Sequence, residues 1–199
     1  MKLLVKTGTS RSALIWAQRM LFAVGILLLG YCGYVVLDTW VFQARESAEL
    51  ERFVPERPAS RGVAIPAIGP DGLIGRIEVQ RLGVSVVVME GTSNQTLRRA
   101  VGHIAGTGLP GQPGNVGIAG HRDTFFRPLR NIQPDDIVTL TTRGGSYRYR
   151  VVSTKVVSPD NVAVLDPDGK EILTLVTCYP FYYVGSAPER FIVRAQRVS

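Results

Sequence analysis

A single cysteine near the carboxyl end of the chain stands where it could act as a nucleophile. Cys178 closes the run TLVTC at residues 174–178, and Tyr179 and Pro180 follow it. We expect this apolar run to be a strand, and a strand end followed by proline is a rigid place to hold a reactive side chain. The only other cysteine, Cys32, lies in a long apolar segment, so the domain around Cys178 cannot form an internal disulfide. A lone thiol of this kind is either a working nucleophile or a small buried hydrophobic residue, and composition leaves both readings open.

A catalytic thiol needs a proton-transfer partner, because a free cysteine, with a pKa of about 8.5, is mostly protonated at neutral pH. The chain contains two histidines. His121 follows a short apolar run at 116–119, so it also lies at a strand end, and two neighbouring strands could bring it to Cys178. His103 lies in a stretch rich in Gly and Pro, where we expect an exposed or loop-packing side chain. His121 is therefore the predicted partner.

Attack on an amide builds negative charge on the carbonyl oxygen, and a preorganised donor must stabilise it. Arg190 opens the last predicted strand, twelve residues beyond Cys178, and a loop of that length can fold back beside the thiol. A guanidinium offers two fixed hydrogen bonds to such an oxygen. Arg194 on the same strand is a rival, although we expect a surface position or a secondary contact for it.

Metal and cofactor chemistry find little support in the sequence. One thiol and two histidines give no spaced set of ligands for zinc, and no acidic cluster suggests a calcium site. The glycine patterns of phosphate-binding and dinucleotide-binding loops are also missing. We therefore predict no cofactor and no metal.

The elements that must position these residues are short β-strands at regular spacing. They are expected at residues 73–79, 84–89, 116–119, 137–141, 147–154, 172–177 and 191–195. Helical segments are confined to connections, at 95–100 and within 124–131, and 102–114 is expected to be a loop. This pattern favours a closed all-β barrel over a β-sandwich.

The amino-terminal segment has the composition of a membrane anchor. Residues 20–37 are 18 in number and carry no charge, and Lys and Arg precede them. That length suits a bilayer-spanning helix, and the positive-inside rule places the amino terminus in the cytoplasm. A cleaved signal peptide is the alternative, but the apolar run is long for one and no A-x-A site closes it.

The chain accordingly divides into four parts. We predict a basic cytoplasmic head at 1–12, a transmembrane signal anchor at 13–37, an extracytoplasmic stalk and linker at 38–72, and a folded domain at 73–199 outside the cytoplasm. Four basic residues precede the first acidic one, so the net charge of +7 falls to +3 for the rest. That remainder includes no long basic run, and nucleic-acid binding is not expected.

Three segments together resemble the sortase family. Residues 117–122 (GIAGHR) are similar to its histidine segment, 174–178 fit its TLxTC signature, and 188–193 (PERFIV) resemble its arginine-bearing last strand. Their order and strand placement agree, and the resemblance covers about residues 73–198. The runs around Tyr179 and His121 are most similar to class D sortases.

This resemblance implies an eight-stranded barrel and a cysteine transpeptidase that cleaves an LPxTG-like sorting motif. Cys178 would attack the carbonyl of the motif's threonine and form a thioester. His121 would protonate the leaving amine and later deprotonate the incoming one, while Arg190 would hold the substrate and the oxyanion. Thr177 is similar to a residue that the family uses to contact substrate backbone.

The resemblance also implies the partners and narrows the class. Substrates would be proteins with a carboxyl-terminal sorting motif, and the acceptor an amine of the cell envelope, such as a peptidoglycan precursor. Residues 55–70 show no Asp-Pro-aromatic lid like that of pilin-assembling class C enzymes, so an open site is expected.

Two other functions stay in competition with the transpeptidase. L,D-Transpeptidases place Ser-His-Gly before their cysteine, whereas this chain has Leu-Val-Thr. A catalytically silent, membrane-anchored binding barrel would leave Cys178 inert to thiol reagents.

Overall fold

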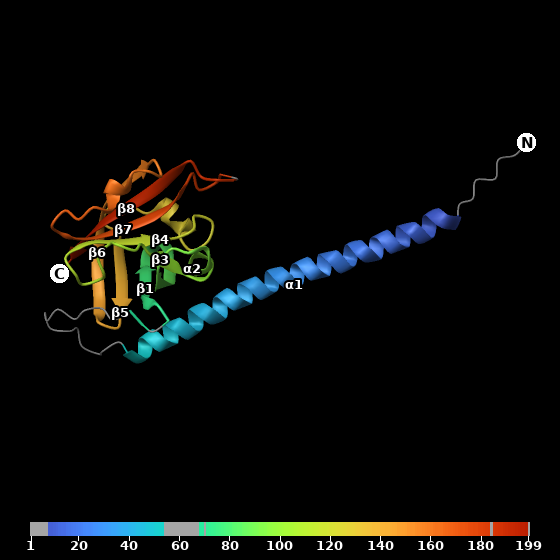
Figure 1. Cartoon of the computed structure of the whole chain (residues 1–199), viewed down its shortest axis with the longest axis horizontal. Helices are drawn as coiled ribbons and strands as arrows, with labels where there is room; N and C mark the ends of the chain where they lie inside the picture. Colours follow the sequence, from blue (N-terminus) through green and yellow to red (C-terminus); the bar gives the residue numbers. More distant parts are fainter. Residues whose placement is uncertain (1–7, 54–67, 70, 184, 199) are drawn as a thin grey trace, which may run out of the picture. The chain divides into compact units, whose positions relative to one another are not determined.

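The computed structural model describes residues 8–53, 68–69, 71–183 and 185–198 (Figure 1). The chain divides between Val41 and Phe42 into two compact units. The first unit is helical, and the second holds every strand of the described ranges.

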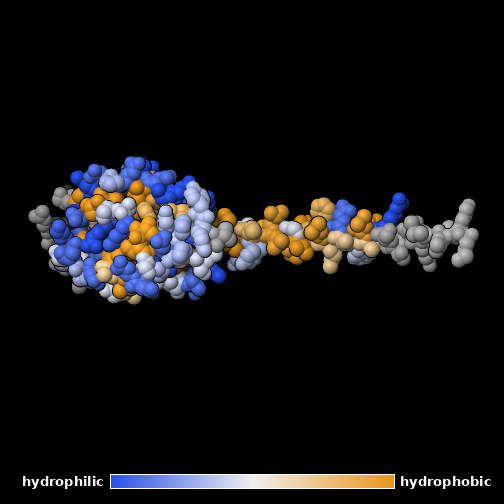
Figure 2. Space-filling model, turned by 90° about the horizontal axis from the view of Figure 1, so that it is seen from above, coloured by the Kyte–Doolittle hydropathy of each residue, from blue (hydrophilic) through white to orange (hydrophobic). Residues whose placement is uncertain are grey.

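The long helix α1 (Gly8–Phe53) includes the whole of the predicted membrane span. Its part from Arg11 to Glu51 is long and apolar enough to cross a bilayer. Large apolar side chains such as Leu21 and Leu29 are exposed along it, and Figure 2 shows apolar groups covering this stretch. A helix that exposes Leu and Phe on all sides needs an apolar surrounding, so this feature is consistent with a single-pass anchor.

The second unit contains a closed barrel of eight strands, which confirms the predicted fold class. The strands are β1 (Leu73–Val79), β2 (Val84–Glu90), β3 (Val101–His103), β4 (Gly114–Ala119), β5 (Ile137–Thr142), β6 (Gly145–Val157), β7 (Glu171–Tyr179) and β8 (Glu189–Val198). Around the barrel they follow the order β1-β2-β3-β4-β7-β8-β6-β5. Pairings β2–β3 and β4–β7 are parallel, and the others are antiparallel. Closure leaves no free sheet edge.

The connections hold one short α-helix and three 3-10 turns. Helix α2 (Asn94–Arg99) begins one residue before the predicted segment 95–100, because Ser93 is the N-cap and its hydroxyl accepts a hydrogen bond from the Thr96 N–H. The turns are η1 (Gln80–Leu82), η2 (Arg127–Asn131) and η3 (Val162–Leu165). The predicted loop at 102–114 was wrong at its start, since β3 occupies 101–103.

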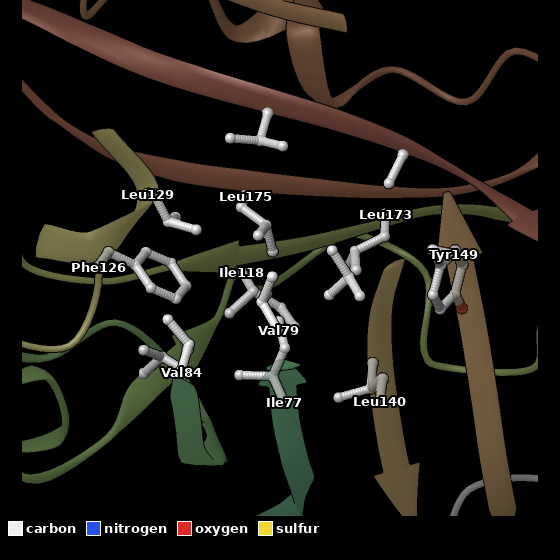
Figure 3. Close-up of a cluster of buried hydrophobic side chains, with 14 of the residues drawn as sticks. Ile77, Val79, Val84, Ile118, Phe126, Leu129, Leu140, Tyr149, Leu173 and Leu175 are labelled. Atoms are coloured by element: carbon white, nitrogen blue, oxygen red, sulfur yellow. The ribbon is translucent and has the colours of Figure 1, made fainter. Parts of the chain in front are cut away.

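Alternating residues of each strand fill the barrel. Figure 3 shows part of this core, which includes Ile77, Ile118, Phe126, Leu173 and Leu175, all at most 1% exposed. Leu173 and Leu175 fix which face of β7 points inward, since side chains alternate along a strand. The even-numbered residues of β7 therefore face away from the core.

The last turns of α1 belong to the same compact unit as the barrel. Leu50 is 1% exposed, and Phe42 packs against Leu73 and Val87. The Gln43 amide donates to the Arg99 carbonyl at 2.5 Å and accepts from the Val87 N–H at 2.9 Å. Residues 42–51 thus pack on the barrel, while 54–67 and 70, in the predicted linker, lie outside the described residues. The domain division at residue 73 stays a prediction.

A buried carboxylate joins η1 to the turn before β5. Asp136 is 8% exposed and accepts hydrogen bonds from Arg81 at 2.5 and 2.6 Å and from the Gln133 N–H at 2.8 Å. The hydrogen bond from Arg81 is the main cause of the lowered pKa of Asp136. A lowered folded-state pKa means that this stabilisation is complete above the unfolded-state pKa of about 3.9 and is lost as the pH falls through the folded-state value.

We expect Asp136→Asn to lower the free energy of unfolding by about 1–2 kcal/mol at pH 7, because the charged acceptor is lost. The difference in unfolding free energy between this variant and the chain without substitutions should narrow as the pH falls through the lowered pKa of Asp136, because the carboxyl group is then protonated. Urea unfolding of the full chain in detergent, followed by near-ultraviolet circular dichroism at pH 7, 5 and 3, measures this effect. Asp135→Asn is the matched control, since the Asp135 side chain is 82% exposed. Equal losses for the two variants at pH 7 would contradict the assignment.

Candidate active site

Adjacent strands β7 and β8 carry Cys178 and Arg190, and His121 follows the end of β4, the other neighbour of β7 (Figure 1). Cys178 is the last residue but one of β7, and Arg190 is the second residue of β8. The two are direct partners in the antiparallel β7–β8 ladder. Opposed residues of such a ladder share a face, with their Cβ atoms about 5 Å apart. The thiol and the guanidinium therefore start from neighbouring points on one surface.

His121 reaches the same surface from β4. This strand runs parallel to β7, with Ala119 opposite Val176. The ladder continues past the end of β4, since the Gly120 N–H donates to the Val176 carbonyl at 3.1 Å. His121 lies two residues beyond Ala119, and Cys178 lies two residues beyond Val176, so the continued register would bring His121 level with Cys178.

The direction of the side chains follows from the core. A Cβ on Gly120 would lie 2.7 Å from the Phe126 ring, so Gly120 faces inward and only glycine fits there. Cys178 and Arg190 alternate with inward residues, Leu175 on β7 and Val193 on β8. The structure thus pairs Cys178 with Arg190, both half-buried, on the outer face of the barrel, and the half-buried His121 follows β4, the strand next to β7.

The hydrogen bonds of the two candidate arginines separate their roles. Arg194, the rival from sequence, donates to the Asp168 carboxylate at 2.7 Å. Arg190 has no ion pair in the described part of the chain, and its Nη1 donates to the carbonyls of Ala187 at 3.2 Å and Glu189 at 2.9 Å. Its other guanidinium nitrogens make no hydrogen bond to a described residue. Arg190 therefore has donors available for a substrate oxygen.

Thr177 lies on the opposite face of β7 from the thiol. It is 2% exposed, and its hydroxyl donates to the Gly120 carbonyl at 2.7 Å. This bond ties the nucleophile strand to the residue before His121. Substrate contact by Thr177 stays a prediction, and the buried hydroxyl leaves only the main chain for it.

His103 does not join the site. It is the last residue of β3 and 3% exposed, so its predicted position in a loop was wrong. Its Nδ1 lies 2.8 Å from the Glu90 carboxylate, and its Nε2 lies 2.9 Å from the Gly108 carbonyl and 3.0 Å from the Thr107 hydroxyl. Both ring nitrogens are thus engaged: Nδ1 contacts the end of β2, and Nε2 contacts the connection between β3 and β4.

A strip of small residues leads along the outer face to the site. Gly117 lies below two flanking connections, because a Cβ there would be 3.0 Å from Thr107 and 3.1 Å from Leu165. Next along the same face comes the opposed pair Ala119 and Val176, both half-buried. Because Thr107 and Leu165 cover Gly117, the part of this face that is open to a peptide begins at Ala119 and Val176.

An aromatic pocket of about 600 Å³ lies where β7 ends. Sequence reasoning did not single it out, although the aromatic run at 179–183 was a visible signal. Its lining consists of Arg130, Tyr179, Pro180, Phe181, Tyr182, Tyr183 and Phe191. Tyr179 and Phe191 point inward from their strands, so the pocket lies at the end of the barrel. The Cys178 thiol, by contrast, lies on the outer face of β7.

Comparison with known proteins agrees with this geometry. A family model described as the sortase domain matches residues 77–198. Sortase D of Bacillus subtilis is 30% identical over 192 residues, which cover 90% of this chain and 96% of that protein. A solved sortase D5 transpeptidase of Clostridium perfringens has a TM-score of 0.67 at 26% identity, covering 80% of this chain and 99% of its own. Sortase C1 from Streptococcus agalactiae has a TM-score of 0.62 at 26% identity, with coverages of 78% and 87%.

The family match covers most of the barrel, and the similarity to the B. subtilis protein extends along nearly its whole length. Two of the three relatives carry the class D name, in agreement with the resemblance of the segments around His121 and Tyr179. The eight-stranded barrel and these likenesses lead to one conclusion: the chain belongs to the sortase family.

Proposed function

We propose that this protein is a membrane-anchored cysteine transpeptidase that cleaves an LPxTG-like sorting motif and transfers the acyl part to an amine of the cell envelope. The observation that carries the proposal is the ladder pairing of Cys178 with Arg190, with His121 two residues beyond the end of the strand that pairs with β7 on its other side. A nucleophile, a proton carrier and a cation at one point are the groups that acyl transfer from an amide requires.

In the first half-reaction the Cys178 sulfur attacks the carbonyl carbon of the motif's threonine. The carbonyl oxygen becomes negative, and the free donors of Arg190 stabilise it. The carbon–nitrogen bond then breaks, and His121 delivers a proton to the leaving amine. The product is a thioester between Cys178 and the threonine carbonyl.

The second half-reaction reverses the proton movement. An acceptor amine attacks the thioester carbonyl, and His121 removes its proton. The carbon–sulfur bond breaks and the Cys178 thiolate leaves, which restores the enzyme. Ala119 and Val176, next to the reacting pair on the outer face, would contact the motif residues before the threonine.

The apolar helix α1 and the basic residues before it support a membrane position for the enzyme. By the positive-inside rule the amino terminus would lie in the cytoplasm, and a single crossing would put the barrel outside. Substrate proteins and cell-envelope amines would meet the site on that side.

Incubation of the detergent-solubilised full chain with a library of sorting-motif peptides tests the function. We expect intact-mass spectrometry, after acid quenching without an acceptor, to find an acyl group on Cys178 equal to the peptide up to its threonine. Added triglycine or a diaminopimelate-containing peptide should consume that adduct and yield the transpeptidation product. Scrambled peptides are the control. A chain that forms no adduct, and whose Cys178 also resists iodoacetamide, would support the silent binding barrel instead.

A further inference from the structure

The residue after the proposed proton carrier binds the loop that joins β7 to β8, residues 180–188. Arg122 Nη1 donates to the Pro180 carbonyl at 3.0 Å. Its Nη2 donates to the carbonyls of Tyr183 at 2.8 Å and Gly185 at 3.0 Å. The guanidinium also lies 5.8 Å from the centre of the Tyr183 ring. One side chain thus binds three main-chain oxygens of a loop that lies 58 to 63 residues away in sequence.

Among the described residues, two other contacts hold this loop. Phe181, near its start, packs at 5.3 Å from the Phe191 ring and against the core. Arg130 Nη1 donates to the hydroxyl of the exposed Tyr182, and its guanidinium lies 5.3 Å from the centre of that ring. These contacts hold side chains, whereas the hydrogen bonds from Arg122 hold the main chain at Pro180, Tyr183 and Gly185. Such a segment opens easily once its hydrogen bonds are lost.

The far end of the same loop holds the oxyanion candidate. Arg190 Nη1 donates to the carbonyls of Ala187 and Glu189, so the direction of its guanidinium depends on the path of the loop. Arg190 is also the ladder partner of Cys178. A continuous chain of contacts therefore runs from Arg122 through the loop to Arg190.

We propose that Arg122 is a positioning residue for acylation: it holds the β7–β8 loop so that the Arg190 guanidinium faces the carbonyl attacked by Cys178. This inference rests on the proposed transpeptidase function. It requires arginine because two nitrogens of one plane reach three carbonyls, and a lysine ammonium lacks that fork. In the described ranges Arg122 forms no ion pair, so these carbonyls are its polar partners.

The first measurement compares single-turnover acylation in Arg122→Ala, Arg122→Lys and the unchanged chain, with Arg127→Ala as the matched control. Arg127 is exposed, and its side chain makes no hydrogen bond to the described residues. We expect Arg122→Ala to slow acylation about 10- to 100-fold, since small misplacements of a catalytic group have effects of that order. Lysine should restore part of the loss, and Arg127→Ala should stay within about twofold.

Two further readouts separate positioning from general damage. The pH profile of Cys178 alkylation by iodoacetamide should not change in Arg122→Ala, because thiol and imidazole stay in place. Amides of 180–188 should exchange hydrogen faster in this variant, whereas those of β7 should not. Slower or pH-shifted alkylation would mean that Arg122 acts on His121 or Cys178 and would overturn the proposal.

A double-mutant cycle tests the route through Arg190. In an Arg190→Lys background the further change Arg122→Ala should slow acylation less than about threefold, because the guanidinium to be positioned is gone. Persistence of the full 10- to 100-fold effect in that background would refute the route. If the chain without substitutions forms no acyl-enzyme, the proposed transpeptidase function is refuted, and with it the role of Arg122 in acylation. If the amides of 180–188 exchange hydrogen at the same rate in Arg122→Ala, Arg122 does not hold the loop. The positioning role would then be refuted, while the proposed transpeptidase function would stand.

Discussion

Cys178→Ala is expected to abolish cleavage of sorting-motif peptides, with a loss of at least about 10³-fold in kcat. The reaction needs a covalent acyl carrier, and alanine offers no atom that can attack the threonine carbonyl. Cys178 is half-buried at the end of β7, so loss of one sulfur there should leave the barrel folded. Peptide turnover measured by chromatography, and the absence of an acyl adduct by intact mass, are the readouts.

The chain provides its own control for this experiment. Cys32 is the other free thiol and lies in α1, away from every strand in sequence. Cys32→Ala should retain full turnover and still form one adduct, whereas Cys178→Ala should form none. Normal cleavage by Cys178→Ala would end the assignment of the nucleophile. If Cys32→Ala lost activity and Cys178→Ala kept it, Cys32 and not Cys178 would be the nucleophile.

Strands with strong apolar alternation were predictable from sequence. The run 73–79 has the bounds of β1, because its inward residues Ile77 and Val79 alternate with polar ones and Gly83, at φ 64°, ends the turn that follows. β3 was missed because its three residues are too few to show a period of two. It exists through its pairings with β2 and β4, which no local pattern reveals.

The residues of the candidate site were predictable from sequence, but the strand register that relates them was not. Cys178, His121 and Arg190 were found because their chemistry limits the choice of residue type and each lies at a predicted strand end. Their convergence depends on the parallel pairing of β4 with β7, which joins residues 57 apart, such as Asn115 and Ile172. Nothing near either strand encodes that register, so it could come only from the resemblance or from the structure.

Contacts made by polar side chains over long distances in sequence could not be predicted at all. Gln43 lies in a charged stretch that resembles any solvated helix, yet its amide bonds the main chain at residues 87 and 99. Arg122 belongs to a motif whose histidine drew attention first, and its three carbonyl acceptors appear only when the β7–β8 loop folds back. Main-chain acceptors have no sequence signature, because every residue carries one.

Arg190→Lys should slow acylation about 10²- to 10³-fold, the range found when one preorganised oxyanion donor is lost. The guanidinium has enough nitrogens to bind the Ala187 and Glu189 carbonyls with Nη1 and a substrate oxygen with the others. Lysine brings a single ammonium group, so it can satisfy the loop or the oxyanion but not both in fixed geometry. The charge stays the same in this variant, and the experiment therefore isolates the planar fork from net electrostatics.

Arg194→Lys is the matched control for this substitution, since Arg194 lies on the same strand and pairs with Asp168. Single-turnover acylation by this variant should stay within about threefold of the unchanged chain, because an exposed ion pair contributes little. The rate of Cys178 alkylation should be unchanged in Arg190→Lys, since the thiol and His121 are intact. Equal losses in the two lysine variants would assign the effect to β8 as a whole. Acylation by Arg190→Lys at nearly the normal rate would mean that the oxyanion finds its donor elsewhere, and the ladder pairing of Arg190 with Cys178 would then be structural.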